Sequence, residues 1–370
     1  MQLSHSANLT GQRIQQYALL SLIGSGGMAD VYWARDERLH RDVAVKALAT
    51  PAARGRRRGR QPKRGGPPAE ARALSRLSHP HITAIYDFLR HRDQEFIVME
   101  LVAGATLREV LAGGPLPPFE VVRLGRQLVS GLAAAHAAHV IHRDIKPANL
   151  KITSSGVLKI LDFGIAALSA GETAPETVNE ATSGLALVGT VPYMAPERLR
   201  GETADARSDV FSAGAVLYEM AAGCRAFPQR PIASLVEAIL GAKVIPLSIA
   251  NPLVPAALER IVMKALANDP GDRQQSAAAL LAELDGLPTT EAAGPGTRPA
   301  PRSPRGLVRT RRSTFKMPTK TRISAGLRGF AAFDALATRH PHRRRRTCFE
   351  RVLIRSPPLP RPGWSAPSPR

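Results

Sequence analysis

The stretch that decides the fold is HRDIKPAN at residues 142–149, which is followed by DFG at residues 162–164. Asp144 can accept the proton of a hydroxyl group, and Lys146 places positive charge near the same point. Asn149 and Asp162 carry the hard oxygen atoms that Mg²⁺ prefers. Each of these residues alone is ordinarily a solvated surface group. Their ordered combination predicts a site for phosphoryl transfer.

Upstream of this stretch, a glycine-rich segment lies between two predicted strands, and its backbone N–H groups can approach phosphate oxygens. The residues expected at the nucleotide here are Gly24, Ser25, Gly26, Gly27, Met28, Ala29 and Val31. A dinucleotide-binding loop should open a helix, whereas DVYWARD at 30–36 alternates like a strand, so that class is excluded. The GxxxxGK[ST] pattern is absent from the sequence.

The next predicted strand, VAVK at residues 43–46, brings Ala44 and Lys46 toward the same nucleotide. A lysine on an inward strand face needs phosphates or a carboxylate to neutralise it. Glu70, which opens the helical pattern EARALSRLS, is the candidate carboxylate.

The pattern of the chain changes near residues 100–104. Short β-type runs such as YALLSLIG and EFIVMELV dominate before this point, and helix-like runs such as FEVVRLGRQLVSGLAAAHAAH dominate after it. The sequence therefore predicts a small β-rich lobe followed by a larger helical lobe.

These motifs together resemble the bacterial eukaryotic-like (Hanks-type) serine/threonine protein kinase family, over about Tyr17 to Gly286. The resemblance implies an α+β, bilobal protein kinase fold with an ATP-dependent serine/threonine kinase activity. The boundaries that we expect are an N-terminal extension at 1–16, a kinase domain at 17–287 (N-lobe 17–101, hinge 100–104, C-lobe 105–287) and a disordered basic tail at 288–370.

The resemblance also implies roles for further residues. In that family the adenine binds backbone groups of the hinge, here Glu100 to Val102, beside Met99. Expected structural residues are His142, Arg143, Glu197, Asp209 and Arg273, with Leu74 and Phe163 stacked against His142. The activation segment would include Phe163, Gly164, Thr182, Ser183 and Thr190, and phosphorylation is expected at Thr182 or Ser183 through Arg143.

The partners implied by the resemblance are ATP, Mg²⁺ or Mn²⁺ in its place, and protein substrates with serine or threonine. A homodimer through the N-lobe is a further expectation. The two cysteines fit a reducing compartment, the N-terminus has no apolar run of a signal peptide, and no stretch reaches the ~18 apolar residues of a membrane span. We therefore expect a cytoplasmic location, unless downstream domains have been lost.

The formal net charge of +21 suggests a nucleic-acid binder until its distribution is considered. Residues 291–370 contribute +16 and residues 51–68 contribute +7, so the rest of the chain carries −2. The basic tail lacks the interleaved aromatic residues of base-stacking modules. A solvated, disordered tail is thus favoured over nucleic-acid binding, and salt-dependent DNA retention of a chain truncated at residue 290 separates the two.

One departure from the family pattern bears on activity. The segment before Glu70 reads PAARGRRRGRQPKRGGPPA, and Pro67 and Pro68 cannot lie inside a helix. The helix should therefore start immediately before Glu70, without its upstream turns. This favours, as the alternative function, a catalytically impaired nucleotide-binding scaffold. Ala29 in place of the third loop glycine is a smaller, tolerable departure.

Two explanations of the basic segments stay open. They are either genuine or the product of a shifted reading frame, because GC-rich DNA read out of frame yields Arg, Pro, Gly and Ala. We favour the frameshift for 51–68 and leave the tail open. A clean in-frame DNA sequence through both segments would remove this explanation.

Overall fold

The computed structural model describes residues 8–26, 29–48, 69–92, 94–163 and 189–288, without the side chains of 69–71. The basic segment 51–68, the candidate phosphorylation sites Thr182 and Ser183, and the tail beyond residue 288 lie outside the described residues. The chain divides into two units, residues 1–289 with 344–370 and residues 290–343. The elements described below belong to the first unit.

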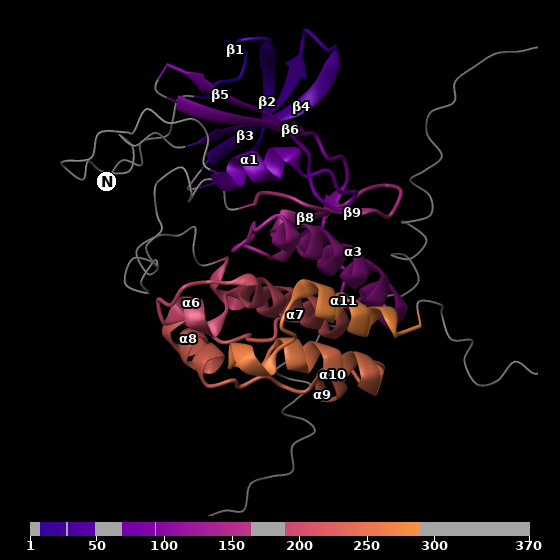
Figure 1. Cartoon of the computed structure of the whole chain (residues 1–370). Coiled ribbons are helices and arrows are strands. Elements are labelled where there is room, and N and C mark those ends of the chain that lie inside the picture. The colour runs from indigo at the N-terminus through magenta and orange to yellow at the C-terminus, as the bar shows by residue number, and fades with distance from the viewer. Residues whose placement is uncertain (1–7, 27–28, 49–68, 93, 164–188, 289–370) are drawn as a thin grey trace, which may run out of the picture. The chain divides into compact units, whose positions relative to one another are not determined.

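Six antiparallel strands form the N-terminal sheet in the order β1-β2-β3-β4-β6-β5 (Figure 1). They are β1 Arg13–Ile14, β2 Tyr17–Ser25, β3 Ala29–Asp36, β4 Arg41–Leu48, β5 Ile85–His91 and β6 Gln94–Glu100. Alternation along β4 divides its side chains between two cores. Val43 and Val45 pack in a core of the sheet itself, whereas Ala44 and Leu48 join the main core that continues into the helical part.

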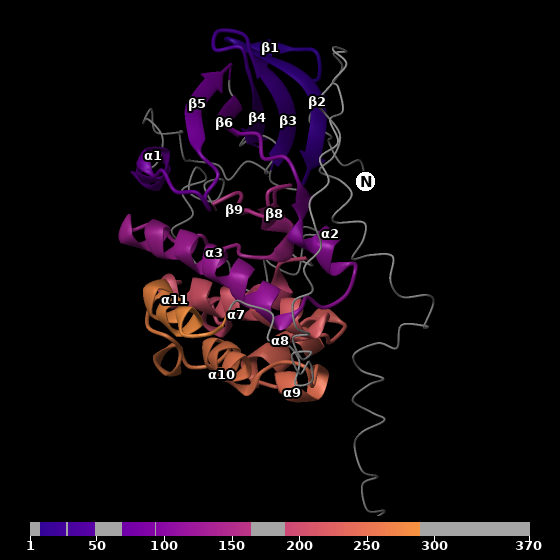
Figure 2. The same ribbon diagram turned by 90° about the vertical axis from the view of Figure 1, so that its right-hand side faces the viewer.

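Helix α1, Ala69–Arg76, lies beside β5 (Figure 2). Its described part spans eight residues, and the residues before Ala69 lie outside the described ones. Its amphipathic spacing buries Leu74 in the main core. The helix that should carry Glu70 is therefore present.

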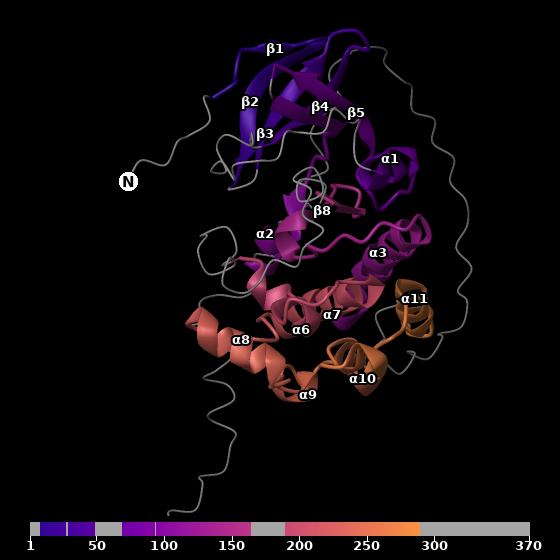
Figure 3. The same ribbon diagram turned by 60° about the vertical axis from the view of Figure 1, so that its left-hand side comes forward.

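The C-terminal part is helical and encloses most of the main core (Figures 1 and 3). Its α-helices are α2 Leu107–Leu111, α3 Pro118–Ala137, α6 Pro196–Leu199, α7 Ala206–Ala222, α8 Ile232–Leu240, α9 Leu247–Ala250, α10 Ala256–Ala265 and α11 Ala277–Asp285. Its 3₁₀-helices are η1 Pro147–Asn149, η2 Val191–Tyr193 and η3 Pro270–Asp272. Helix α7 is apolar on nearly all sides and is buried accordingly. The observed architecture confirms the predicted bilobal α+β fold.

A small three-stranded sheet lies above α3 and positions the catalytic segments (Figure 2). Its strands are β7 Ala105–Thr106, β8 Leu150–Ile152 and β9 Leu158–Ile160. Thr83 binds the carbonyl of Ile160 through both its backbone N–H, at 3.0 Å, and its hydroxyl, at 2.9 Å. The segment before β5 thus fixes the strand that leads directly to Asp162.

Among the helices of the described residues, none combines the length and the apolar character that crossing a membrane requires.

Candidate active site

The catalytic loop is held by the buried carboxylate of Asp209 in α7. Oδ2 accepts the backbone N–H of His142 at 2.8 Å, and Oδ1 accepts that of Arg143 at 2.9 Å. The Nε2 atom of His136 lies 2.9 Å from the same Oδ2. Burial on its own would raise the pKa of Asp209, but the hydrogen bonds from His136 and from the His142 backbone hold it below its ordinary value. Asp209 therefore acts as an anion that stabilises the loop.

Asp144 has one carboxylate oxygen that accepts hydrogen bonds and one that has no partner among the described residues. Oδ2 accepts from Nζ of Lys146 at 2.8 Å and from Nδ2 of Asn149 at 2.9 Å. Oδ1 is buried and has no hydrogen-bond partner among the described residues. The same Lys146 ammonium donates to Oγ1 of Thr190 at 2.8 Å, so it links the carboxylate to the end of the activation segment. This arrangement leaves one unsatisfied acceptor on an otherwise fixed carboxylate.

Lys46 on β4 meets Asp162 rather than solvent. Its Nζ lies 2.9 Å from Oδ1 of Asp162, and its side chain is 13% exposed. The side chain of Glu70, the partner that the sequence suggested, lies outside the described residues. The ion pair with Asp162 joins the lysine of the small lobe to the DFG segment of the large one.

The glycine-rich segment connects β2 and β3, two adjacent antiparallel strands, as the alternation of the sequence predicted. Gly24 pairs with Val31, and the N–H of Gly26 donates to the carbonyl of Ala29 at 3.1 Å. Val31 in turn lies opposite Lys46 on β4. Gly27 and Met28, at the tip, lie outside the described residues, as does Gly164 after Phe163.

The hinge follows β6, where Met99 lies opposite Ala44. The backbone N–H of Glu100 donates to the carbonyl of Ala84 at 2.9 Å, and Val102 is buried at 6% exposure. The predicted nucleotide residues Ala44, Lys46, Glu100 and Val102 thus come from neighbouring strands and from the segment between the lobes.

Two lysines that the sequence analysis did not select also reach the hinge. Lys151 on β8 donates to the carbonyl oxygen of Val102 at 2.8 Å, and Lys159 on β9 lies 2.9 Å from Oε2 of Glu100. No motif marks either residue, because their partners lie 49 and 59 positions away in the chain.

The residues predicted to hold a divalent cation supply suitable atoms. Asn149 donates its Nδ2 hydrogens to Asp144, so its amide oxygen is the atom that can bind a cation. Asp162 supplies a carboxylate. Within the described ranges no group of three or more His, Cys, Asp or Glu side chains forms a complete metal site. The set fits Mg²⁺ that is also bound by nucleotide phosphates and water.

Three side chains that the sequence placed in one stack belong to a common packed region. The rings of His142 and Phe163 lie 4.5 Å apart between centroids, and Phe163 and Leu74 are both buried in the main core. Nε2 of His142 lies 2.9 Å from the carbonyl of Leu161. A cavity beside them is lined by Lys46, Thr83, Ile85, Ile97, Met99, Asp162 and Phe163.

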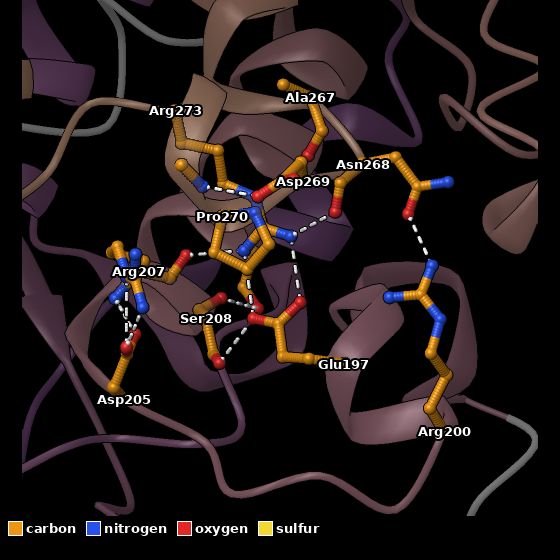
Figure 4. Close-up of polar contacts among 12 residues, drawn as sticks. Glu197, Arg200, Asp205, Arg207, Ser208, Ala267, Asn268, Asp269, Pro270 and Arg273 are labelled. Carbon is orange, nitrogen blue, oxygen red and sulfur yellow. Dashed lines mark hydrogen bonds and ion pairs between the residues drawn. The ribbon is translucent and has the colours of Figure 1, made fainter.

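Glu197 in α6 and Arg273 after η3 form a fully buried ion pair (Figure 4). The guanidinium donates to both carboxylate oxygens, at 2.9 and 2.8 Å, and Ser208 donates to Oε1 at 2.6 Å. Burial alone would raise the pKa of Glu197, but the hydrogen bonds from Arg273 and Ser208 keep it below its ordinary value. The pair fixes the segment that starts α6 to the chain near η3.

A further, partly buried pair was missed by sequence reasoning. The hydroxyl of Tyr193 donates to Oε2 of Glu219 at 2.5 Å. Burial raises the pKa of both groups, and the nearby Arg225 opposes this increase. Nothing in the local pattern of either residue marks the pair, since 26 positions separate them.

The chain is similar to known proteins. A family model described as protein kinase domain matches residues 17–283. The chain is 38% identical over 278 residues to the serine/threonine-protein kinase PrkC of Bacillus subtilis, a match that covers 75% of this chain and 41% of PrkC. It is 38% identical over 274 residues to the serine/threonine-protein kinase PknB of Mycobacterium leprae, covering 73% of this chain and 42% of PknB. The chain thus spans about two fifths of the length of these curated relatives.

Among solved structures, the crystal structure of Rad53 1-466 in complex with AMP-PNP is similar, with a TM-score of 0.58 and 23% sequence identity. The match covers 72% of this chain and 64% of that chain, and it shows a shared fold. Since the family model matches most of the chain and includes every motif described above, this chain belongs to the protein kinase domain family.

Proposed function

We propose that this chain transfers the γ-phosphoryl group of ATP to serine or threonine hydroxyls of protein substrates. The observation that carries this proposal is the state of Asp144, whose Oδ2 is fixed by Lys146 and Asn149 while Oδ1 lacks a partner in the described structure. The side chain as a whole is 33% exposed, so the residue lies at an accessible face of the site. The names of PrkC and PknB support the same activity.

The residues have distinct roles in this reaction. The substrate oxygen forms a bond to the γ-phosphorus while the bond from that phosphorus to the β–γ bridging oxygen breaks, so that ADP leaves. Asp144 accepts the hydroxyl proton, and Lys146 stabilises negative charge on the transferring group. Lys46 would bind phosphate oxygens, and the described hinge residues would hold the base.

Asn149 and Asp162 are the residues that would hold Mg²⁺, which neutralises charge on the β- and γ-phosphates when bound. The contact between Lys146 and Thr190 supports serine and threonine as the acceptors, because it resembles the serine/threonine subclass of the family.

The decisive experiment measures labelled phosphate transferred from ATP to a basic model protein. Asp144→Asn should lower the turnover by about 10²- to 10⁴-fold, because it removes the proton acceptor, and should leave the Kd for ADP unchanged. Asp42→Asn, at an exposed ion pair with Arg35, is the matched control and should keep the wild-type rate. Equal turnover by wild type and Asp144→Asn would contradict the proposal.

A second candidate function is a nucleotide-binding scaffold without catalysis. Pro67 and Pro68 before Glu70 favour it, because a helix without its upstream turns would weaken control of the group that would face Lys46. ADP binding by a wild-type chain that transfers no phosphate would support this alternative.

Autophosphorylation in bacterial signalling forms part of the proposal. Arg143, beside the catalytic base, supports a phosphate-binding role, and the target residues are Thr182 or Ser183. Phosphopeptide mapping after incubation with ATP should find phosphate at one of them, and its absence from both would refute this part. A homodimer through the N-lobe and a cytoplasmic location are also proposed; sedimentation equilibrium tests the first and cell fractionation the second.

A further inference from the structure

Lys151 occupies a special place on the middle strand of the small sheet. Its neighbours Leu150 and Ile152 are buried in the main core, at 0% and 6% exposure. Because successive side chains of a strand point to opposite faces, Lys151 projects to the other face. There it lies between Thr106 on β7 and Lys159 on β9, its partners in the strand register.

From this face the two lysines reach the hinge in different ways. Lys159 forms an ion pair with the carboxylate of Glu100 at 2.9 Å, whereas the ammonium of Lys151 donates at 2.8 Å to a backbone carbonyl, that of Val102. Val102 is the residue whose backbone should bind the nucleotide base. Lys151 therefore places a charged hydrogen-bond donor on a group of the base site itself.

We propose that Lys151 is a specificity-determining residue that selects adenine against purines with an amino group at C2. This inference rests on the proposed function, because it requires the base to bind through the hinge backbone. If the N–H of Val102 donates to N1 of adenine, the carbonyl of the same residue faces the adjacent carbon, C2. Adenine carries only a hydrogen at C2 and needs no acceptor there.

A 2-amino group would meet a carbonyl that already accepts from an ammonium. It would bring a second donor close to a positive charge, and the lone pair that Lys151 leaves on the carbonyl would be a weaker acceptor, because the ammonium already draws on that oxygen. Guanine and 2,6-diaminopurine both carry this group. Lys151 thus penalises them through the Val102 carbonyl, independently of the contacts at N1 and N6.

The test compares the Kd of ADP with that of 2-amino-ADP, the 2,6-diaminopurine analogue, by titration calorimetry on the full chain. The two nucleotides differ only at C2. Wild type should bind 2-amino-ADP about tenfold more weakly than ADP. In Lys151→Met the carbonyl is free to accept from the 2-amino group, and the ratio of the two Kd values should fall by about tenfold.

Two variants serve as controls. Lys151→Arg keeps a charged donor and should keep the wild-type ratio. Lys159→Met removes the neighbouring lysine on the paired strand, which binds a carboxylate rather than the Val102 carbonyl, and should also keep it. Lys151→Leu repeats the test with a second apolar side chain.

An unchanged ratio in Lys151→Met and Lys151→Leu, with ADP still bound, would overturn this inference and leave the proposed function intact. Equal affinity of wild type for both nucleotides would overturn it without any variant. A wild-type chain that binds no ADP would contradict the proposed function and this inference together.

Discussion

At the residue scale, Arg273 shows how a buried charge is satisfied. Its five N–H donors bond to both oxygens of Glu197 and to the carbonyls of Ala267, Asn268 and Arg207, at 2.8 to 3.0 Å (Figure 4). A planar guanidinium suits this because its donors form a rigid fork. Few other side chains could replace it, since each missing donor would leave a buried acceptor unsatisfied.

Arg273→Met should therefore lower the free energy of unfolding by about 3–5 kcal/mol, because it leaves the Glu197 carboxylate buried and unpaired. Urea titration followed by circular dichroism measures this loss. Lys264→Met breaks the exposed pair with Glu283 and is the control, with an expected change below about 1 kcal/mol. Similar losses in both variants would refute the distinction between a buried and an exposed pair.

Single residues also show which parts of the candidate active site could be predicted from the sequence. Asp144, Lys146 and Asn149 lie within one short segment, so their spacing was enough to predict that they share a site. Lys151, two positions further, went unselected because its role depends on the partner across the hinge. A lysine has no local signature that tells a solvated ammonium from one bound to a carbonyl.

At the element scale, the junction between the hinge and β7 depends on a glycine. Gly104 has φ of +136°, and a Cβ there would lie 2.1 Å from the carbonyl oxygen of Ile152 on β8. The close approach lets β7 pair with β8 directly after the hinge. A side chain would separate the two strands or distort the hinge.

We expect Gly104→Ala to be more destabilising than Gly114→Ala, in which φ is +119° but no atom lies within 4 Å of the added Cβ. Both carry the conformational cost, on the order of 1–3 kcal/mol, and only the first adds a clash with backbone. Thermal unfolding by calorimetry gives the comparison. A lower Tm for Gly114→Ala would show that the close approach does not matter.

Helices and strands could be predicted from the sequence where the local pattern of apolar and polar residues is clear. Alternation predicted β3 and β4, with the glycine loop between β2 and β3. The small sheet of β7, β8 and β9 was not predicted. Its strands have two or three residues each and exist because distant segments pair, which no local pattern of that length can encode.

At the scale of the whole molecule, stability should depend on pH in two steps. Partial burial, with the charges of His81 and Lys159, lowers the pKa of His79 below its ordinary 6.5, so the folded state resists its protonation. Stability is then full above pH 6.5 and declines as the pH falls below this value. The pKa of Glu197 is lowered from 4.5, so its contribution is present above pH 4.5 and is lost as the pH falls further.

Unfolding free energies measured by urea titration between pH 3 and 8 should show both declines in wild type. His79→Asn should remove the decline in stability that begins at pH 6.5. His40→Asn, at an exposed histidine, should retain it. Equal slopes for wild type and His79→Asn between pH 5 and 6.5 would contradict the assignment.

The family, the order of the two lobes and the residues of the catalytic loop could all be predicted from the sequence, because short segments and local periodicity encode them. The sequence also showed that residues 51–68 and 291–370 hold the whole excess of positive charge, since the rest of the chain has a net charge of −2. Two partners became known only from the packing of the whole chain: Asp162 for Lys46 and the Val102 carbonyl for Lys151. The physical reason is that a hydrogen bond or ion pair requires atoms about 3 Å apart, and for distant residues the packing of the whole chain sets that distance.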